Sequence, residues 1–301
     1  VLCADAQAPR KAAGMIKCGR ATSAWLLAFV LGNGMFYPPA AAAQASEATR
    51  QWLLDHWNHA LSSPPDLGLI SSMLYGLVSD PEAAAQSETR QALAALQTLL
   101  GALDRQRLDC GDLVNLRFIG SFLDMNGVAF EAGALDSRLH ACLDKMKPFD
   151  LASVLFSLCR FPSGGLPREK LAPAIKSIED LQQADGGFGS SFGLQRYYLS
   201  THAVFALHTC GGHPDVVRRG QIYLRNGLPQ LRQLGFVDGV LESLIMLRKM
   251  GVEIPQQRLY TDYVRSKIKE DGSVCFFDHP GCPSDPHATS LLLEFLREFG
   301  E

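Results

Sequence analysis

Apolar residues recur at helical spacing along most of the chain after residue 46. In the first such stretch, leucines mostly three or four positions apart form one helix face: Leu93, Leu96, Leu99, Leu100 and Leu103. Similar faces follow at 203–207, 241–247 and 292–299, and no stretch alternates apolar and polar residues as a strand does. The pattern predicts an all-α protein.

Four of the predicted helices end in the same way, with a leucine followed four residues later by a glycine. They end at Leu123–Gly127, Leu207–Gly211, Leu247–Gly251 and Leu296–Gly300. A glycine suits the left-handed conformation just past a helix end, where a Cβ atom is strained. A related ending at Leu158 has Pro162 instead, and the five leucines lie 35, 49, 40 and 49 residues apart. Such periods are typical of stacked helical hairpins.

Two of these hairpins share a turn. Asp185 precedes two glycines and Phe188, and Asp271 precedes Gly272. The two aspartates lie 86 residues apart, close to the 89 residues between Leu207 and Leu296. Residues 181–211 and 268–300 therefore resemble two copies of one unit, and we interpret the Asp-Gly pair as a structural turn rather than a site.

The first 45 residues differ from the rest. Met15 opens a short basic stretch, an apolar run follows at 21–31, and small residues lead to an Ala-x-Ala exit at Ala45. This order is typical of a secretory signal peptide, and the apolar run is short for a membrane span, which needs ~20 residues. We expect residues 1–14 to be a gene-call overhang, 15–45 the signal peptide and 46–301 a single exported domain, periplasmic or extracellular. An uncleaved N-terminal anchor is the alternative.

Composition excludes several classes of protein. The chain has 301 residues, of which 47% are hydrophobic, so it can build a sizeable core and is not disordered. It has 28 basic and 31 acidic residues, a formal charge of −3, and no long basic run. We therefore expect no nucleic-acid partner, and no membrane span once the signal is removed.

Six cysteines follow the predicted signal peptide, and an even number in an exported protein permits disulfides. Cys275 and Cys282 flank a loop containing Pro280 and are our first expectation for a local bridge. Cys159 and Cys210 lie inside apolar helical runs, where a bridge and a small buried core residue are both open.

The C-terminal half resembles the α/α-toroid superfamily of protein prenyltransferase β subunits and terpenoid (squalene-type) cyclases. Residues 185–189 with 199–207 look like one prenyltransferase repeat, and 278–300 look like its last repeat. In the last repeat the matching residues are Asp278, Pro280, Gly281, Asp285, Pro286 and Thr289. The resemblance covers about residues 181–300 and implies a ring of inner and outer helices around a central cavity.

The prenyltransferase zinc set does not carry over. Those enzymes hold catalytic zinc with an Asp, a Cys and a His; in this chain the resemblance puts Phe236, Asp238 and Ala288 at those positions. His287 lies one place before the histidine position, roughly 100° around a helix. The classical zinc site is therefore not predicted, the cofactor stays unknown, and the acidic motif of squalene-type cyclases is also absent.

If the toroid forms, the starts of its inner helices rim one mouth of the cavity. There we expect four catalytic candidates, Asp238, Glu242, His202 and His287, because carboxyl and imidazole groups around an apolar bowl can transfer protons. The ligand-binding candidates are Tyr197, Tyr198, Phe205, Phe236 and Asp285. Asp112, Asp150 and Asp285 can equally be helix N-caps, and Asp238 with Glu242, one turn apart, can be a solvated or paired face.

Two further clusters could ligate a metal. His202, His208, His213 and Cys210 lie close in sequence, although a helix separates the first two by about 240°. Asp278, His279, Cys282, Asp285 and His287 form the densest group, with a disulfide-pinned loop as the alternative. We assign no metal ligands from the sequence, which also lacks the common hydrolase, zinc-protease and nucleotide-binding motifs.

Three functions stay open. The first is an exported toroid that handles an apolar or isoprenoid-like ligand in its cavity, whether or not it is an enzyme. The second is a carbohydrate-active lyase or hydrolase that binds a glycan, with Arg196 beside the candidates already named. The third is a non-catalytic interaction scaffold whose centre is filled. We favour the first, and that choice rests on the fold alone.

Overall fold

A computed structural model describes residues 39–62, 64–78, 84–128, 130, 133–160, 168–190 and 193–300. Within these residues the chain forms twelve α-helices, two 3₁₀ helices and no strand. The all-α prediction is confirmed. The predicted overhang and most of the predicted signal peptide lie outside the described residues, so those expectations stay predictions.

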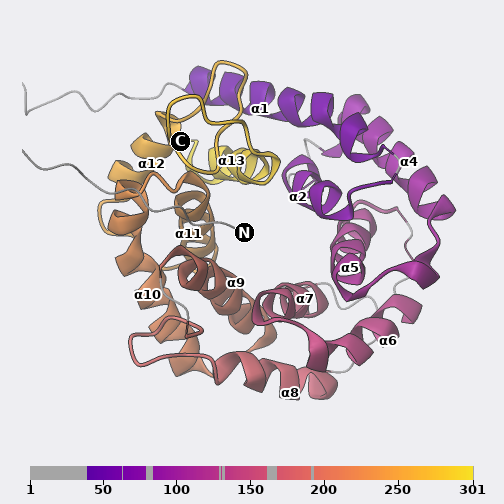
Figure 1. The fold of residues 1–301 in the computed structure, drawn as a ribbon. Helices are drawn as coiled ribbons and strands as arrows, with labels where there is room; N and C mark the ends of the chain where they lie inside the picture. The colour runs from indigo at the N-terminus through magenta and orange to yellow at the C-terminus, as the bar shows by residue number, and fades with distance from the viewer. Residues whose placement is uncertain are drawn as a thin grey trace, which may run out of the picture. The chain divides into compact units, whose positions relative to one another are not determined.

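Six helices pack against one another in a closed series. They are α2 (Leu67–Val78), α5 (Cys110–Met125), α7 (Pro148–Arg160), α9 (Leu194–Cys210), α11 (Val237–Lys249) and α13 (Pro286–Phe299). Each contacts the next, and α13 contacts α2, so the last helix of the chain lies against one of the first. Figure 1 shows these helices around a common centre.

Six more helices lie outside that series. They are α1 (Pro39–Ala60), α4 (Ser87–Ala102), α6 (Gly133–Cys142), α8 (Arg168–Glu179), α10 (Pro214–Gln233) and α12 (Gln257–Arg265). Each of α6, α8, α10 and α12 contacts the inner helix that precedes it in sequence (Figure 1). Ten of the 13 residues of α11 are buried, against three of nine in α12, because inner helices are covered on every side and outer helices on one.

The helix α1 begins at Pro39, before the predicted cleavage point after Ala45. Its Thr49 hydroxyl donates a 2.8 Å hydrogen bond to the carbonyl of Gly272, in the second Asp-Gly turn. Cleavage after Ala45 would remove about two turns of α1 and leave this contact in place. None of the helices in the described part of the chain is long and apolar enough to cross a membrane.

Three disulfides join Cys110 to Cys142, Cys159 to Cys210, and Cys275 to Cys282. The expected local bridge between Cys275 and Cys282 is confirmed. The open question at Cys159 and Cys210 is settled in favour of a bridge, which ties the end of α7 to the end of α9. Disulfides are compatible with an oxidising compartment.

The glycine endings behave as predicted at three of four positions. Gly127, Gly211 and Gly251 have φ values of 71°, 70° and 69°, the left-handed conformation. Gly300 is the exception, with φ of −76°. A Cβ atom there would lie 2.2 Å from the carbonyl oxygen of Leu296. Glycine is therefore required at this position because a side chain would collide with the backbone, and not because of the φ angle.

Candidate functional site

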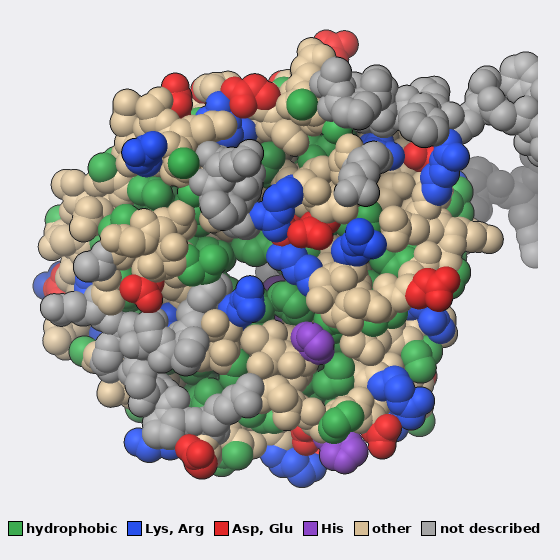
Figure 2. Space-filling model, turned by 180° about the vertical axis from the view of Figure 1, so that it is seen from behind, with side chains coloured by type: hydrophobic (Ala, Val, Ile, Leu, Met, Phe, Trp, Pro, Cys, Tyr) green, Lys and Arg blue, Asp and Glu red, His purple; other side chains and the backbone are tan. Residues whose placement is uncertain are grey.

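A cavity of about 470 Å³ lies among the inner helices. Most of its wall is aromatic or aliphatic: Tyr75, Val114, Phe118, Phe122, Phe149, Phe156, Tyr198, Phe205, Ile245, Met246, Phe276 and Leu291. Phe156 and Phe205 stack with their ring centroids 4.6 Å apart. Seen from behind, the molecule is hollowed near its middle (Figure 2). This size and lining suit a small, mainly apolar molecule.

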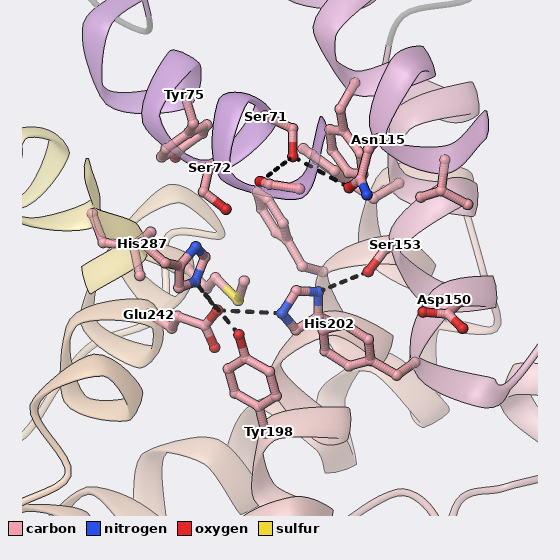
Figure 3. A pocket seen from close by; sticks show the side chains of 18 of the residues that line it. Ser71, Ser72, Tyr75, Asn115, Asp150, Ser153, Tyr198, His202, Glu242 and His287 are labelled. Atoms are coloured by element: carbon pink, nitrogen blue, oxygen red, sulfur yellow. Dashed lines mark hydrogen bonds and ion pairs between the residues drawn. The ribbon is translucent and has the colours of Figure 1, made fainter. Parts of the chain in front are cut away.

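Polar side chains gather on one wall of the cavity. Glu242 on α11, His202 on α9 and His287 on α13 point toward one another (Figure 3). Oε1 of Glu242 lies 3.2 Å from Nε2 of His202 and 3.4 Å from Nε2 of His287. Three helices far apart in sequence therefore bring a carboxylate between two imidazoles.

Two further groups complete this wall. The hydroxyl of Tyr198 lies 3.5 Å from Nε2 of His287. Asp238 lies one helical turn before Glu242 and is fully buried, with Oδ1 at 3.6 Å from the same imidazole nitrogen. Asp238 does not line the cavity and lies behind Glu242 and His287. We call Asp238, Glu242, His202 and His287 the acid–imidazole cluster.

Neighbouring hydroxyl groups hold the cluster in place. The hydroxyl of Thr201 donates a 2.8 Å hydrogen bond to Oε2 of Glu242. The hydroxyl of Ser153, on α7, lies 3.2 Å from Nδ1 of His202 (Figure 3). The ring of Phe149 packs against His202 with centroids 4.3 Å apart. The carboxylate of Glu242 and the imidazole of His202 are thus each oriented by a hydrogen bond with a neighbouring hydroxyl group.

Burial and charge shift the cluster's protonation in opposite directions. Burial raises the pKa of Asp238 well above its usual range, and the nearby His287 opposes this only in part. Burial also acts to raise the pKa of Glu242, but the two histidines outweigh it and lower that pKa to about 2. Burial lowers the pKa of His287, yet the carboxyl groups of Asp238 and Glu242 raise it to about 9. Without another cation, the cluster holds an ionised Glu242 beside a protonated His287.

Not every ligand-binding candidate reaches the cavity. Tyr198 and Phe205 line it, as expected. Tyr197 does not: it is buried on the other side of α9, and its hydroxyl donates to the carbonyl of Leu224 at 2.6 Å. Consecutive helical residues point ~100° apart, so only one of the two tyrosines can face the centre.

Phe236 and Asp285 also lie outside the cavity lining. Phe236 is buried and stacks on Phe277 with centroids 4.7 Å apart, so it belongs to the core. The carboxylate of Asp285 accepts a 2.8 Å hydrogen bond from the backbone N–H of Ala288 and caps α13. The cap interpretation therefore applies to Asp285.

The other two cap candidates differ from expectation. The N-cap of α5 is Asp109, and Asp112 is its reciprocal partner in a capping box. Asp150 lies in the first turn of α7 and lines the cavity. Asp150 is thus a cavity carboxylate on a different helix from Glu242 (Figure 3).

Neither of the two metal clusters considered from the sequence is assembled. Cys210 is bridged to Cys159, and the ring of His213 accepts a hydrogen bond from Asp215 N–H as the N-cap of α10. Cys282 is bridged to Cys275, and Asp278 pairs with Lys267 at 2.7 Å. One histidine of each cluster, His202 from the first and His287 from the second, instead lies beside Glu242 at the cavity wall.

The sequence analysis missed the part of the cavity that the first half of the chain supplies. Ser71 on α2 and Asn115 on α5 form a hydrogen bond of 3.2 Å opposite the cluster (Figure 3). On α7, Phe149, Ser153 and Phe156 follow i, i+4, i+7 spacing and all line the cavity. That stripe was visible in the sequence as a helix face carrying one polar residue between aromatic ones.

Together the fold and site define an all-helical protein with an aromatic-walled cavity and a buried acid–imidazole cluster. No family model matches the chain, and no curated protein is similar to it in sequence. The chain is similar in fold to a solved structure described as the crystal structure of a protein from Actinoplanes. The TM-score is 0.54 and the identity 14%, over 86% of this chain and 100% of that one. At this identity the similarity shows a shared fold alone.

Proposed function

We propose that this protein is an exported α/α toroid that binds a small apolar or isoprenoid-like molecule in its central cavity. The observation that carries the proposal is the cavity itself, with largely apolar walls and the acid–imidazole cluster on one side. Such a lining places the apolar part of a ligand against Phe156 and Phe205 and leaves its polar end to Glu242, His202 and His287.

The helix contacts support the toroid. The inner helices form a series in which each contacts the next and α13 contacts α2, as the resemblance to prenyltransferase β subunits and squalene-type cyclases implies. The three disulfides support export, because such bonds persist in oxidising compartments.

The geometry favours an apolar ligand over a glycan. Glycosidases flank the scissile bond with two carboxyl groups ~5–9.5 Å apart, both of which reach the sugar. Here Asp238 and Glu242 lie on one helix, and of these two only Glu242 lines the cavity. The other carboxylate that lines the cavity, Asp150 on α7, takes no part in the acid–imidazole cluster. The arginine considered for lyase chemistry, Arg196, instead pairs with Asp185 in the Asp-Gly turn and does not line the cavity.

The geometry also argues against a pure scaffold. A scaffold leaves its centre filled and without convergent polar groups. This centre holds about 470 Å³ of space, and three buried or half-buried polar side chains meet at its wall. Placing a carboxylate and imidazoles against an apolar cavity costs desolvation free energy, which a ligand with a polar end would offset.

Calorimetric titration tests the proposal. Farnesol, an apolar isoprenoid alcohol, is titrated into the full chain, and maltotetraose serves as the glycan probe. We expect saturable 1:1 binding of farnesol with a negative heat-capacity change, because apolar surface is buried, and no heat from maltotetraose. Binding of the sugar without farnesol would overturn the proposal in favour of the carbohydrate-active alternative, and binding of neither would overturn the ligand-binding function.

A further inference from the structure

The acid–imidazole cluster has the composition of a metal centre. Oδ1 of Asp238, Oε1 of Glu242 and Nε2 of His287 all lie within 4.8 Å of one another. These three donors come from two inner helices, α11 and α13. Nε2 of His202, on α9, approaches the same Glu242 oxygen but lies outside this group.

The distances between donor atoms are those of ligands around one small ion. Zinc binds histidine nitrogen and carboxylate oxygen at ~2.0–2.1 Å, which puts neighbouring tetrahedral ligands about 3.3–3.4 Å apart. Within the group, His287 Nε2 lies 3.4 Å from Oε1 of Glu242 and 3.6 Å from Oδ1 of Asp238. Charge-assisted hydrogen bonds are shorter, at ~2.7–2.9 Å, so direct hydrogen bonding fits these spacings less well than a shared ion does.

Asp238 supplies an independent observation. Its side chain is fully buried and aimed at His287, yet neither carboxylate oxygen has a hydrogen-bond partner. A buried carboxyl group in native proteins is almost always hydrogen-bonded, paired or bound to a metal, because leaving it alone costs several kcal/mol. The contact to His287 at 3.6 Å is long for a pair, and a cation between these two groups would satisfy both.

One contact of Glu242 is also that of a metal ligand. Ligating carboxylates are usually held by their second oxygen, as Thr201 holds Oε2 of Glu242. This contact leaves Oε1 of Glu242 facing Nε2 of His287.

The set differs from the classical prenyltransferase zinc ligands. Two of the positions that the resemblance assigns to those ligands hold Phe236, which belongs to an aromatic stack, and Ala288, which is fully buried. Neither side chain can bind a metal, so the classical set does not fit this chain. The third of those positions holds Asp238, which is one of the donors described above. The other two donors lie elsewhere: Glu242 is one turn later in α11, and His287 is one residue earlier in α13.

We propose that Asp238, Glu242 and His287 bind one divalent transition-metal ion of the zinc type at the wall of the cavity, with His202 beside them as a partner of Glu242. Glu242 and His287 line the cavity, so the ion would meet an oxygen atom of whatever occupies it. In this respect the inference deepens the proposed function, because it assigns the cluster a binding role at the polar end of the ligand.

Equilibrium dialysis of the full chain tests the proposal without any assay of activity. The protein is stripped with EDTA, dialysed against zinc or magnesium, and analysed for bound metal. We expect one zinc per chain and no stoichiometric magnesium, because imidazole donors favour zinc over magnesium. Replacement of zinc by cobalt(II) should give the intense visible absorption of a four-coordinate ion. Absence of stoichiometric zinc, or equal binding of magnesium, would overturn the proposal.

Matched variants locate the site. Removing the hydrogen-bond partner of a metal ligand typically weakens metal binding ~10–100-fold, so Thr201→Val should weaken zinc binding about 10-fold or more. Glu242→Gln changes a ligand itself and should weaken zinc binding at least about 100-fold. Exposed Glu253→Gln and exposed His208→Asn are the controls and should leave zinc binding unchanged. Equal loss in controls and site variants would contradict the assignment. If Glu242→Gln does not fold, the cobalt spectrum of the unmodified protein still tests whether the protein binds a four-coordinate metal ion.

The ligand proposal and the metal proposal can be tested independently of each other. Farnesol is titrated into the metal-free and the zinc-loaded protein. Absence of zinc binding with farnesol still bound would overturn only the metal site. Zinc binding without farnesol binding would overturn the proposed ligand and leave the metal site standing.

Discussion

At the scale of single residues, the polar part of the cavity wall includes three ionisable side chains, Glu242, His202 and His287. Glu242, His202 and His287 were chosen because they are ionisable and lie near expected helix starts, and the structure brings them together. Tyr197 and Phe236 were chosen as aromatic candidates for the cavity wall, and both are core residues. Which side of a helix faces the centre depends on long-range contacts, and the sequence near a residue carries little information about those contacts.

The aromatic wall offers a test at this scale. Phe205 lines the cavity and is half-buried, so Phe205→Ala removes apolar contact with a bound ligand. Burying a phenylalanine contributes ~1.5–3 kcal/mol, and 1.4 kcal/mol is tenfold in affinity, so farnesol should bind about 10-fold more weakly or worse. The measurement is the same calorimetric titration.

Phe277→Ala is the matched control for that variant. Phe277 is also half-buried and stacks on Phe236, but it does not line the cavity. The control should keep the affinity of the unmodified protein. Equal weakening in both variants would show that the effect comes from stability and not from contact with the ligand.

At the scale of elements, helices and turns were well predicted because their signals are local. The Asp-Gly turn at Asp185 forms as expected, with its carboxylate accepting the Gly187 N–H at 3.1 Å. In the turn at Asp271, the carboxylate likewise accepts a hydrogen bond from the backbone N–H two residues later, that of Ser273, at 3.0 Å. The shared contact supports the interpretation that the two segments are copies of one unit. No comparable local signal marks the cavity face of α2 and α5, and those elements were not assigned to the site.

One junction between elements is set by a single close contact. Gly76 on α2 packs against α13, and a Cβ atom there would lie 2.7 Å from Oγ and 2.8 Å from the carbonyl oxygen of Ser290. Because backbone cannot yield cheaply, Gly76→Ala should lower the free energy of unfolding by ~1–3 kcal/mol. Urea denaturation measures this change.

Gly101→Ala on α4 is the matched control. Gly101 is exposed in a helix, and a Cβ atom there meets nothing within 4 Å. Alanine has the higher helix propensity, so this variant should raise the free energy of unfolding by about 0.5 kcal/mol. If Gly76→Ala is as stable as Gly101→Ala, then α2 and α13 do not pack as described.

At the scale of the whole molecule, the period of 35–49 residues predicted repeated helical hairpins, but it did not predict that α13 returns to α2. That expectation came from the family resemblance. An open superhelix and a closed ring have the same local periodicity, and they differ only in a contact between residues more than 200 positions apart, such as Gly76 with Ser290. Closure matters for function because it brings α9, α11 and α13 into one cavity wall with α2, α5 and α7.

In the proposed complex, the cavity holds an apolar molecule whose polar end meets the acid–imidazole cluster. A crystal structure of the full chain grown with farnesol would show this arrangement. We expect electron density running along Phe156 and Phe205, with the hydroxyl oxygen at Glu242, His202 or His287. Farnesol bound only on the outer surface, or a centre closed by side chains, would contradict it.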